Sequence, residues 1–226
     1  MSYLLLLETS GKNCSVALAD EQNVLSSKSA TAEHFVHAEL LHVLISELFA
    51  ELSLSPNSIA AIAVSKGPGS YTGLRIGVSA AKGLCFALNI PLIAIDTTEI
   101  LAHNAAITAP EATRIIPMID ARRMEVYAAH FDAHVNRLSS DEAIIIDENS
   151  FSDLQNEQLV LVGDGAEKCR PFVPENTLIQ SILPNADMMH PLAIRLFHQN
   201  QFEDLAYFEP FYLKDYIPGT SRKSVL

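Results

Sequence analysis

The chain has 226 residues, of which 49% are hydrophobic, and a mean hydropathy of +0.18. This length and composition support one large domain or two small ones around a buried core and exclude wholesale disorder. The net charge of −12 excludes a protein that neutralises many nucleic-acid phosphates by itself, so a nucleic-acid role would need a partner.

The first 106 residues alternate apolar runs with helical periodicity. Short apolar runs predict strands, and Leu41, Leu44 and Leu48 recur at helical spacing. Asp96 and Glu99 suit the N-cap and N3 positions of a capping box. In chain order we expect strands over 3–7, 14–19 and 24–30, a helix over 33–52, a strand from 59, a helix over 74–88, a strand from 92 and a helix ending near 106.

Past Pro110 the pattern restarts with IIPMIDARRMEVYAAHF, an apolar strand ending in an acid, a polar turn and a second strand. Glu8 and Asp120 occupy equivalent places, which indicates a weak repeat of architecture. A further strand, LVLVGDGA, precedes one predicted helix, and another is predicted over 191–201. We expect lobes over 1–106 and 107–205 and a loose tail over 206–226.

Three widely spaced cysteines without a CxxC pair predict neither a disulfide framework nor a zinc ribbon. The longest unbroken apolar run, residues 59–64, is far shorter than the roughly 20 residues that span a bilayer. The amino terminus lacks the basic region of a signal peptide. We therefore expect a cytoplasmic protein with no membrane association.

The segment KGPGSYTGLRIG, residues 66–77, is rich in glycine where a strand meets a helix. Such a place can bind an anion. Its spacing fits neither a Walker A loop nor the dinucleotide fingerprint, which favours a tight structural turn. Further along, small residues form one helical stripe that would let a second helix approach, either within the chain or from another subunit.

Two polar turns facing each other across a cleft could cradle an Mg-nucleotide, with Glu8 and Asp120 as the available acids. No lysine or arginine is placed as in a known phosphate loop, so nucleotide binding stays an alternative. The candidate residues are Glu8, Thr9, Ser10, Asp120, Gly163, Asp164 and Gly165.

The sequence offers no complete metal or catalytic set. The pairs His34/His37 and His130/His134 lack a further ligand at a diagnostic spacing, and Ser79 lies within a predicted helix rather than in a nucleophile elbow. We assign no metal ligand and no catalytic residue.

The segments LLLLETS, KGPGSYTGLRIGVSAAKGL, NIPLIAIDT and IDARRMEVYAA together resemble the TsaB (YeaZ) family over most of the chain. The resemblance implies an actin-like, sugar-kinase-like (ASKHA) α/β fold of two lobes, with duplicated hairpin-containing mixed sheets flanked by helices. One position departs from the family, because Glu8 stands where the family usually has aspartate.

The resemblance also implies a function. The family is bacterial and works in the threonylcarbamoyladenosine (t6A) modification of tRNA, as a non-catalytic scaffold that binds and activates the paralogue TsaD. Further expected partners are the ATPase TsaE, tRNA through the complex, and a second copy when the chain is alone. We expect no tightly bound cofactor, and ATP or ADP with Mg²⁺ in the complex stays open. TsaD carries two metal-binding histidines where this chain has Thr97 and Leu101.

By resemblance, two helices of the first lobe contact TsaD, and we expect Gly77→Leu to break the heterodimer while leaving a folded chain. The alternative functions are a small-molecule or nucleotide-dependent kinase or ATPase of the same fold, and a metallopeptidase. The expected interface residues are Leu41, Leu44, Leu48, Gly73, Gly77, Ala80, Ala81 and Leu84.

Overall fold

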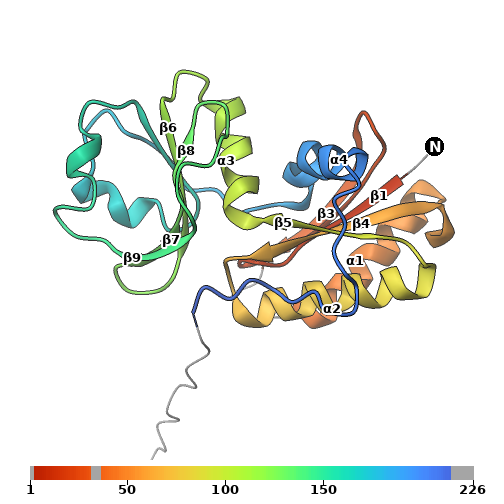
Figure 1. Cartoon of the computed structure of the whole chain (residues 1–226). Coiled ribbons are helices and arrows are strands. Elements are labelled where there is room, and N and C mark those ends of the chain that lie inside the picture. Colours follow the sequence, from red (N-terminus) through yellow and green to blue (C-terminus); the bar gives the residue numbers. More distant parts are fainter. Residues whose placement is uncertain (1–2, 32–36, 215–226) are drawn as a thin grey trace, which may run out of the picture.

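The computed structural model describes residues 3–31 and 37–214, and these fold into two lobes, each built on its own sheet (Figure 1). The first sheet contains β1 (Tyr3–Glu8), β2 (Asn13–Ala19), β3 (Val24–Thr31), β4 (Ile59–Gly67) and β5 (Leu92–Asp96). The second contains β6 (Arg114–Asp120), β7 (Glu125–Ala128), β8 (Phe131–Asp132), β9 (Glu142–Ile145), β10 (Leu159–Val162) and β11 (Leu178–Gln180). The α-helices are α1 (His37–Leu52), α2 (Tyr71–Leu88), α3 (Thr97–Thr108) and α4 (His190–His198).

The two sheets share a mixed topology. The first has the order β3-β2-β1-β4-β5. In this sheet β4 pairs in parallel with both β1 and β5, and β2 pairs antiparallel with both β1 and β3. The second has the order β11-β10-β6-β7-β9, with β8 paired to β6. Each sheet contains an antiparallel hairpin, β1–β2 in one and β6–β7 in the other.

Both faces of the first sheet are covered, which explains the unbroken leucine run of β1. Leu5 and Leu7 lie in a cluster with α1 and α2, whereas Leu4 and Leu6 lie in a second cluster with α3 and α4. Successive side chains of a strand point to opposite faces, so a strand buried on both sides reads as a continuous apolar run.

Helix α3 lies between the lobes (Figure 1). Ile100 packs on the first sheet, and Leu101 and Ala105 pack on the second. Asp96 is the N-cap residue of α3 as predicted, but the capping box does not form, because Asp96 makes no side-chain cap hydrogen bond. Its carboxylate instead faces Lys66 of β4 at 3.4 Å and Arg137 of the second lobe at 3.5 Å, so it helps to join the lobes.

Several predicted elements differ from the structure. Helix α2 begins at Tyr71, not at 74, because the Ser70 hydroxyl caps it by accepting from the Gly73 N–H. The helix predicted after β10 is a short 3-10 turn, Glu167–Phe172. Helix α4 falls in the stretch assigned to the second lobe, yet Leu192 packs on the first sheet. Residues 33–36 of the predicted first helix lie outside the described residues.

Residues 203–214, here called the C-terminal strap, run along α2 and onward to the second lobe (Figure 1). The Lys82 ammonium donates to the carbonyl of Phe208 at 2.8 Å, and the Phe211 N–H donates to the carbonyl of Lys66 at 2.7 Å. Lys214 then pairs with Glu125 of β7. The expectation of a loose tail is therefore wrong for 206–214, and 215–226 lie outside the described residues. None of the described helices is both long and apolar enough to cross a membrane.

Candidate protein-interaction site

The turn after β1 and the glycine loop before α2 pack directly on one another. The Ser70 N–H donates to the carbonyl of Ser10 at 2.6 Å, and the Thr9 hydroxyl donates to the carbonyl of Gly73 at 2.8 Å. These bonds join the two segments that the sequence analysis considered as a phosphate cradle. The two bonds hold the turn against the glycine loop.

Glycines are required here because the turn lies so close. A Cβ at Gly69 would lie 2.4 Å from the Ser10 carbonyl oxygen, and a Cβ at Gly73 would lie 2.1 Å from that of Thr9. A Cβ at Gly77 would lie 2.2 Å from the Thr9 hydroxyl oxygen. The glycine pattern is therefore explained by contact with the chain's own turn, without a bound phosphate.

Glu8 is fully buried at the end of β1. One carboxyl oxygen accepts from the Ser10 N–H at 2.6 Å, and the other has no hydrogen-bond partner among the described residues. Burial raises the pKa of Glu8 above its ordinary value of 4.5, outweighing the lowering by the hydrogen bond from the Ser10 N–H. The side chain of Glu8 is therefore enclosed by the protein and has no surface exposed to solvent.

Glutamine at position 8 is expected to change how stability depends on pH. A raised native pKa means that the folded chain holds a proton that the unfolded chain releases, so stability falls as pH rises above about 4.5. Glu8→Gln removes this loss and should make the chain more stable than wild type at pH 8 but not at pH 4. Urea unfolding at both pH values measures the difference, and an equal effect of the variant at both would contradict a raised pKa.

Asp120, the acidic residue of the second lobe's hairpin, has different surroundings from Glu8. Asp120 pairs with Lys168 at 2.5 Å, and its N–H donates to the Asp164 carboxylate at 2.9 Å. A Cβ at Gly163 would lie 2.3 Å from the carbonyl oxygen of Met118, so this glycine also allows a close approach of the chain to itself. Lys168 was missed by the sequence analysis, because it follows β10 in the sequence and lies beside the hairpin only in the folded chain.

The two hairpins are not joined into one site. Within residues 3–31 and 37–214, no hydrogen bond or ion pair links the turn at 8–10 to Asp120 or to the turn at 163–165. No group of three or more histidine, cysteine, aspartate or glutamate side chains in this part of the chain is placed to hold a metal ion.

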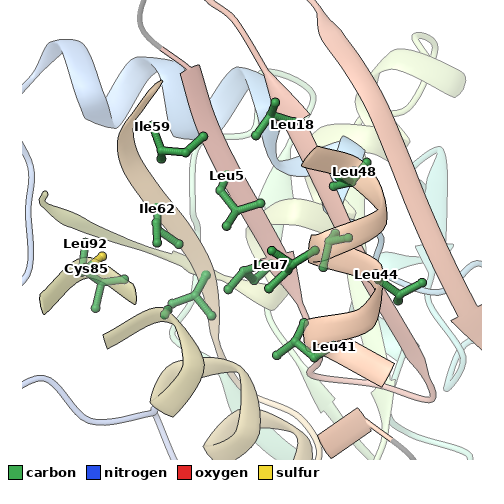
Figure 2. Close-up of a cluster of buried hydrophobic side chains, with 14 of the residues drawn as sticks. Leu5, Leu7, Leu18, Leu41, Leu44, Leu48, Ile59, Ile62, Cys85 and Leu92 are labelled. Atoms are coloured by element: carbon green, nitrogen blue, oxygen red, sulfur yellow. The ribbon is translucent and has the colours of Figure 1, made fainter. Parts of the chain in front are cut away.

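The leucines of α1 lie in the core. Leu41 and Leu48 are fully buried and Leu44 is 8% exposed, and Figure 2 shows them in the same cluster as Leu5 and Leu7. They pack the helix onto the sheet and are not available to a partner. The expectation that these three side chains form a docking surface is contradicted by their burial.

The small residues of α2 divide between two faces. Gly73, Gly77 and Ala81 are buried against the turn and the sheet, so internal packing accounts for them. Gly83 and Ala87, in contrast, are exposed, and a Cβ at Gly83 would have no atom within 4 Å. Ala80 and Leu84 are half-buried between these two faces. The expected interface residues of α2 are thus buried or half-buried, and Gly83 and Ala87, which were not among them, form an exposed crest of small side chains.

Apolar side chains accompany this crest. Phe86 of α2 is 82% exposed and Val43 of α1 is 49% exposed. Between the two helices lies a groove of about 220 Å³. It is lined by Leu5, His42, Ile45, Ser46, Phe49, Pro56, Ile59, Leu84 and Leu88. A groove between two helices that also carry exposed apolar residues is suited to binding the apolar surface of another protein.

Comparison with known proteins is consistent with this geometry. The family model for TsaD, tRNA N6-adenosine threonylcarbamoyltransferase, matches residues 7–172. The chain is 31% identical to the tRNA threonylcarbamoyladenosine biosynthesis protein TsaB of Haemophilus influenzae, covering 94% of this chain and 93% of the relative. It is 28% identical to TsaB of Escherichia coli, covering 94% of each.

Among solved structures, YeaZ from Pseudomonas aeruginosa superposes with a TM-score of 0.82 at 29% identity, covering 94% of this chain and all of that one. The two-lobed fold is the actin-like, sugar-kinase-like fold expected from the sequence. Fold and family therefore agree, and neither assigns a catalytic residue.

Proposed function

The chain belongs to the TsaB (YeaZ) family, and on that basis we propose that it is the non-catalytic scaffold subunit that binds and activates the transferase TsaD. Its relatives are named for tRNA threonylcarbamoyladenosine biosynthesis, and the chain takes part in that biosynthesis. In the proposed complex, TsaD performs the transfer and this chain holds TsaD in its active form. The net charge of −12 supports tRNA binding by the complex rather than by this chain alone.

The observation that carries the docking proposal is Gly83. Glycine within a helix destabilises it by about 1 kcal/mol relative to alanine. Nothing within the described chain requires glycine here, because a Cβ would lie in open space. A partner helix that packs closely against α2 would require it, since small residues let two backbones approach. The crest at Gly83 and Ala87, with Phe86 and the groove beside it, is therefore the proposed TsaD-binding face.

The filled phosphate cradle supports the absence of catalysis. The turn at 8–10 occupies the space beside the glycine loop, and Glu8 is fully buried there. Asp120 is paired with Lys168. These contacts support a role for this chain without kinase or ATPase chemistry.

Mg-ATP is expected to leave the melting temperature of the isolated chain unchanged. A ligand that binds the folded state stabilises it by about 2.7 kcal/mol at a concentration 100 times its Kd. A thermal-shift titration up to millimolar Mg-ATP measures this, with magnesium chloride alone as the control. A saturable rise with Mg-ATP would contradict the filled cradle and favour the nucleotide-dependent alternative.

The same face would join two copies of the chain when TsaD is absent. Exposed apolar residues such as Phe86 and Val43 are unfavourable in water, and a symmetric pair would cover them. TsaE would join the complex of this chain with TsaD.

Sedimentation velocity tests the docking proposal. The chain alone should sediment as a dimer that excess TsaD converts to a heterodimer, whereas two species that never interact would contradict it.

A further inference from the structure

A second pocket lies on the other flank of α2, between this helix and the C-terminal strap. It has a volume of about 300 Å³, at the lower end of the range for binding pockets in proteins. Its polar lining is provided by Arg75, Ser79 and Lys82 of α2 together with Glu209 and Tyr212 of the strap. Residues 75, 79 and 82 recur at helical spacing, so they lie along one side of the helix.

Both cations of this pocket are held in place by uncharged groups. The Arg75 guanidinium lies 4.2 Å from the centre of the Tyr71 ring, and its Nε donates to the Tyr212 hydroxyl at 3.1 Å. The Lys82 ammonium donates to the carbonyls of Ala206 at 3.4 Å and Phe208 at 2.8 Å. The strap thus fixes the direction of two positive charges that face the same pocket.

Neither cation has a carboxylate within 4.0 Å in the described part of the chain. This is notable in a chain with 27 acidic and 15 basic residues, where eight other lysines and arginines form such pairs. Glu209 lines the pocket but forms no ion pair there. The terminal N–H groups of the Arg75 guanidinium have no acceptor among the described residues.

We propose that this pocket binds a carboxylate side chain of the TsaD protein that docks on α2. The inference rests on the proposed function, and it names a polar anchor beside the apolar face. Ser79 is exposed and lies toward the crest that carries Gly83 and Phe86, so a partner covering the crest reaches the mouth of the pocket. A carboxylate entering it meets the unpaired guanidinium and ammonium groups, which form the strongest hydrogen bonds available to it.

The affinity for TsaD is the first test. Arg75→Gln and Lys82→Gln are each expected to weaken heterodimer formation about tenfold or more, because each removes one partner of a desolvated charge pair. Both should also reduce the dependence of the affinity on salt. Arg170→Gln is the matched control, because Arg170 is an exposed arginine already paired with Glu167. The melting temperature of each free variant shows whether it remains folded.

A carbodiimide cross-link provides direct evidence, because it joins an amine to a carboxylate only where the two are in contact. Treatment of the heterodimer should link Lys82 to an aspartate or glutamate of TsaD, identified by peptide mass spectrometry. The link should be absent in Lys82→Arg, whose guanidinium does not react. A link from Lys82 to Glu209 instead would overturn the proposal, because the chain's own acid would then fill the pocket.

The outcomes separate this inference from the docking proposal. If wild type and both glutamine variants bind TsaD with equal affinity and equal salt dependence, the docking proposal stands and the pocket proposal is wrong. If wild type does not bind TsaD at all, the docking proposal fails and the pocket has no such carboxylate to receive. Weakened binding together with the Lys82 cross-link supports both.

Discussion

Leucine at position 83 is expected to abolish docking on TsaD while the free chain folds as before. A Cβ at Gly83 lies in open space, so a larger side chain meets nothing within the described chain. Leucine also favours a helix over glycine by almost 1 kcal/mol, so the melting temperature of Gly83→Leu should be unchanged or higher. In the complex, the leucine side chain would occupy the space that a closely packed helix of TsaD needs. Sedimentation velocity with equimolar TsaD measures the loss of the heterodimer.

Gly83→Ala is the graded control for this variant. It adds a single methyl group, so it should stabilise the free chain and weaken docking much less than leucine does. A Gly83→Leu chain that binds TsaD as tightly as wild type would remove the crest of α2 from the interface.

Alanine at position 73 is expected to destabilise the chain strongly. A Cβ at Gly73 would lie 2.1 Å from the carbonyl oxygen of Thr9, a backbone atom that cannot rotate away. Overpacking of this kind costs about 1–3 kcal/mol, and we expect the upper end because the turn is also bonded to Ser70 and Gly73. Urea unfolding measures the difference from wild type.

Gly83→Ala again provides the comparison, because it makes the same chemical change in the same helix and should raise stability. The two variants should therefore shift the unfolding midpoint in opposite directions. Equal midpoints would mean that the turn does not fill the space beside the glycine loop, and nucleotide binding there would have to be considered again. By the same reasoning Gly77→Leu, expected from the sequence to affect only the heterodimer, should disturb the fold at Thr9.

Much of the fold could be predicted from local patterns. The leucine run of β1 and the restart after Pro110 indicated buried strands and two related hairpins, because apolar runs bounded by polar turns depend on local sequence. The position of α4 could not be predicted in this way. It follows the second lobe in the chain but packs on the first, and periodicity shows that a helix has an apolar face without showing which sheet covers it.

The proposed interaction site could be predicted only in part, because periodicity does not show what covers each face of a helix. The stripe on α2 was predicted to let a second helix approach, but Gly73 and Gly77 face the chain's own turn, and the outward-facing Gly83 was not part of the predicted stripe. Leu41 and Leu48 formed the strongest helical pattern because they are core residues. One signal in the sequence pointed to the outward face, namely Phe86 and Ala87 on the side of the helix opposite to the buried positions.

The contacts of the strap had no signal in the sequence. Lys82 and Arg75 find their partners in residues more than a hundred positions later, such as Phe208 and Tyr212. Contacts at this separation depend on the path of the chain after α4, which the proline-rich end of the sequence does not indicate. The pocket between α2 and the strap is accordingly a finding of the structure alone.

The central claim is that the chain supports t6A formation by docking and not by chemistry of its own. Nucleoside mass spectrometry of tRNA tests it in cells depleted of the native protein and supplied with one of three forms: wild type, the double variant Glu8→Gln with Asp120→Asn, or Gly83→Leu. We predict that t6A is restored by wild type and by the double variant, and not by Gly83→Leu. Restoration by Gly83→Leu together with failure of a folded double variant would contradict the scaffold account.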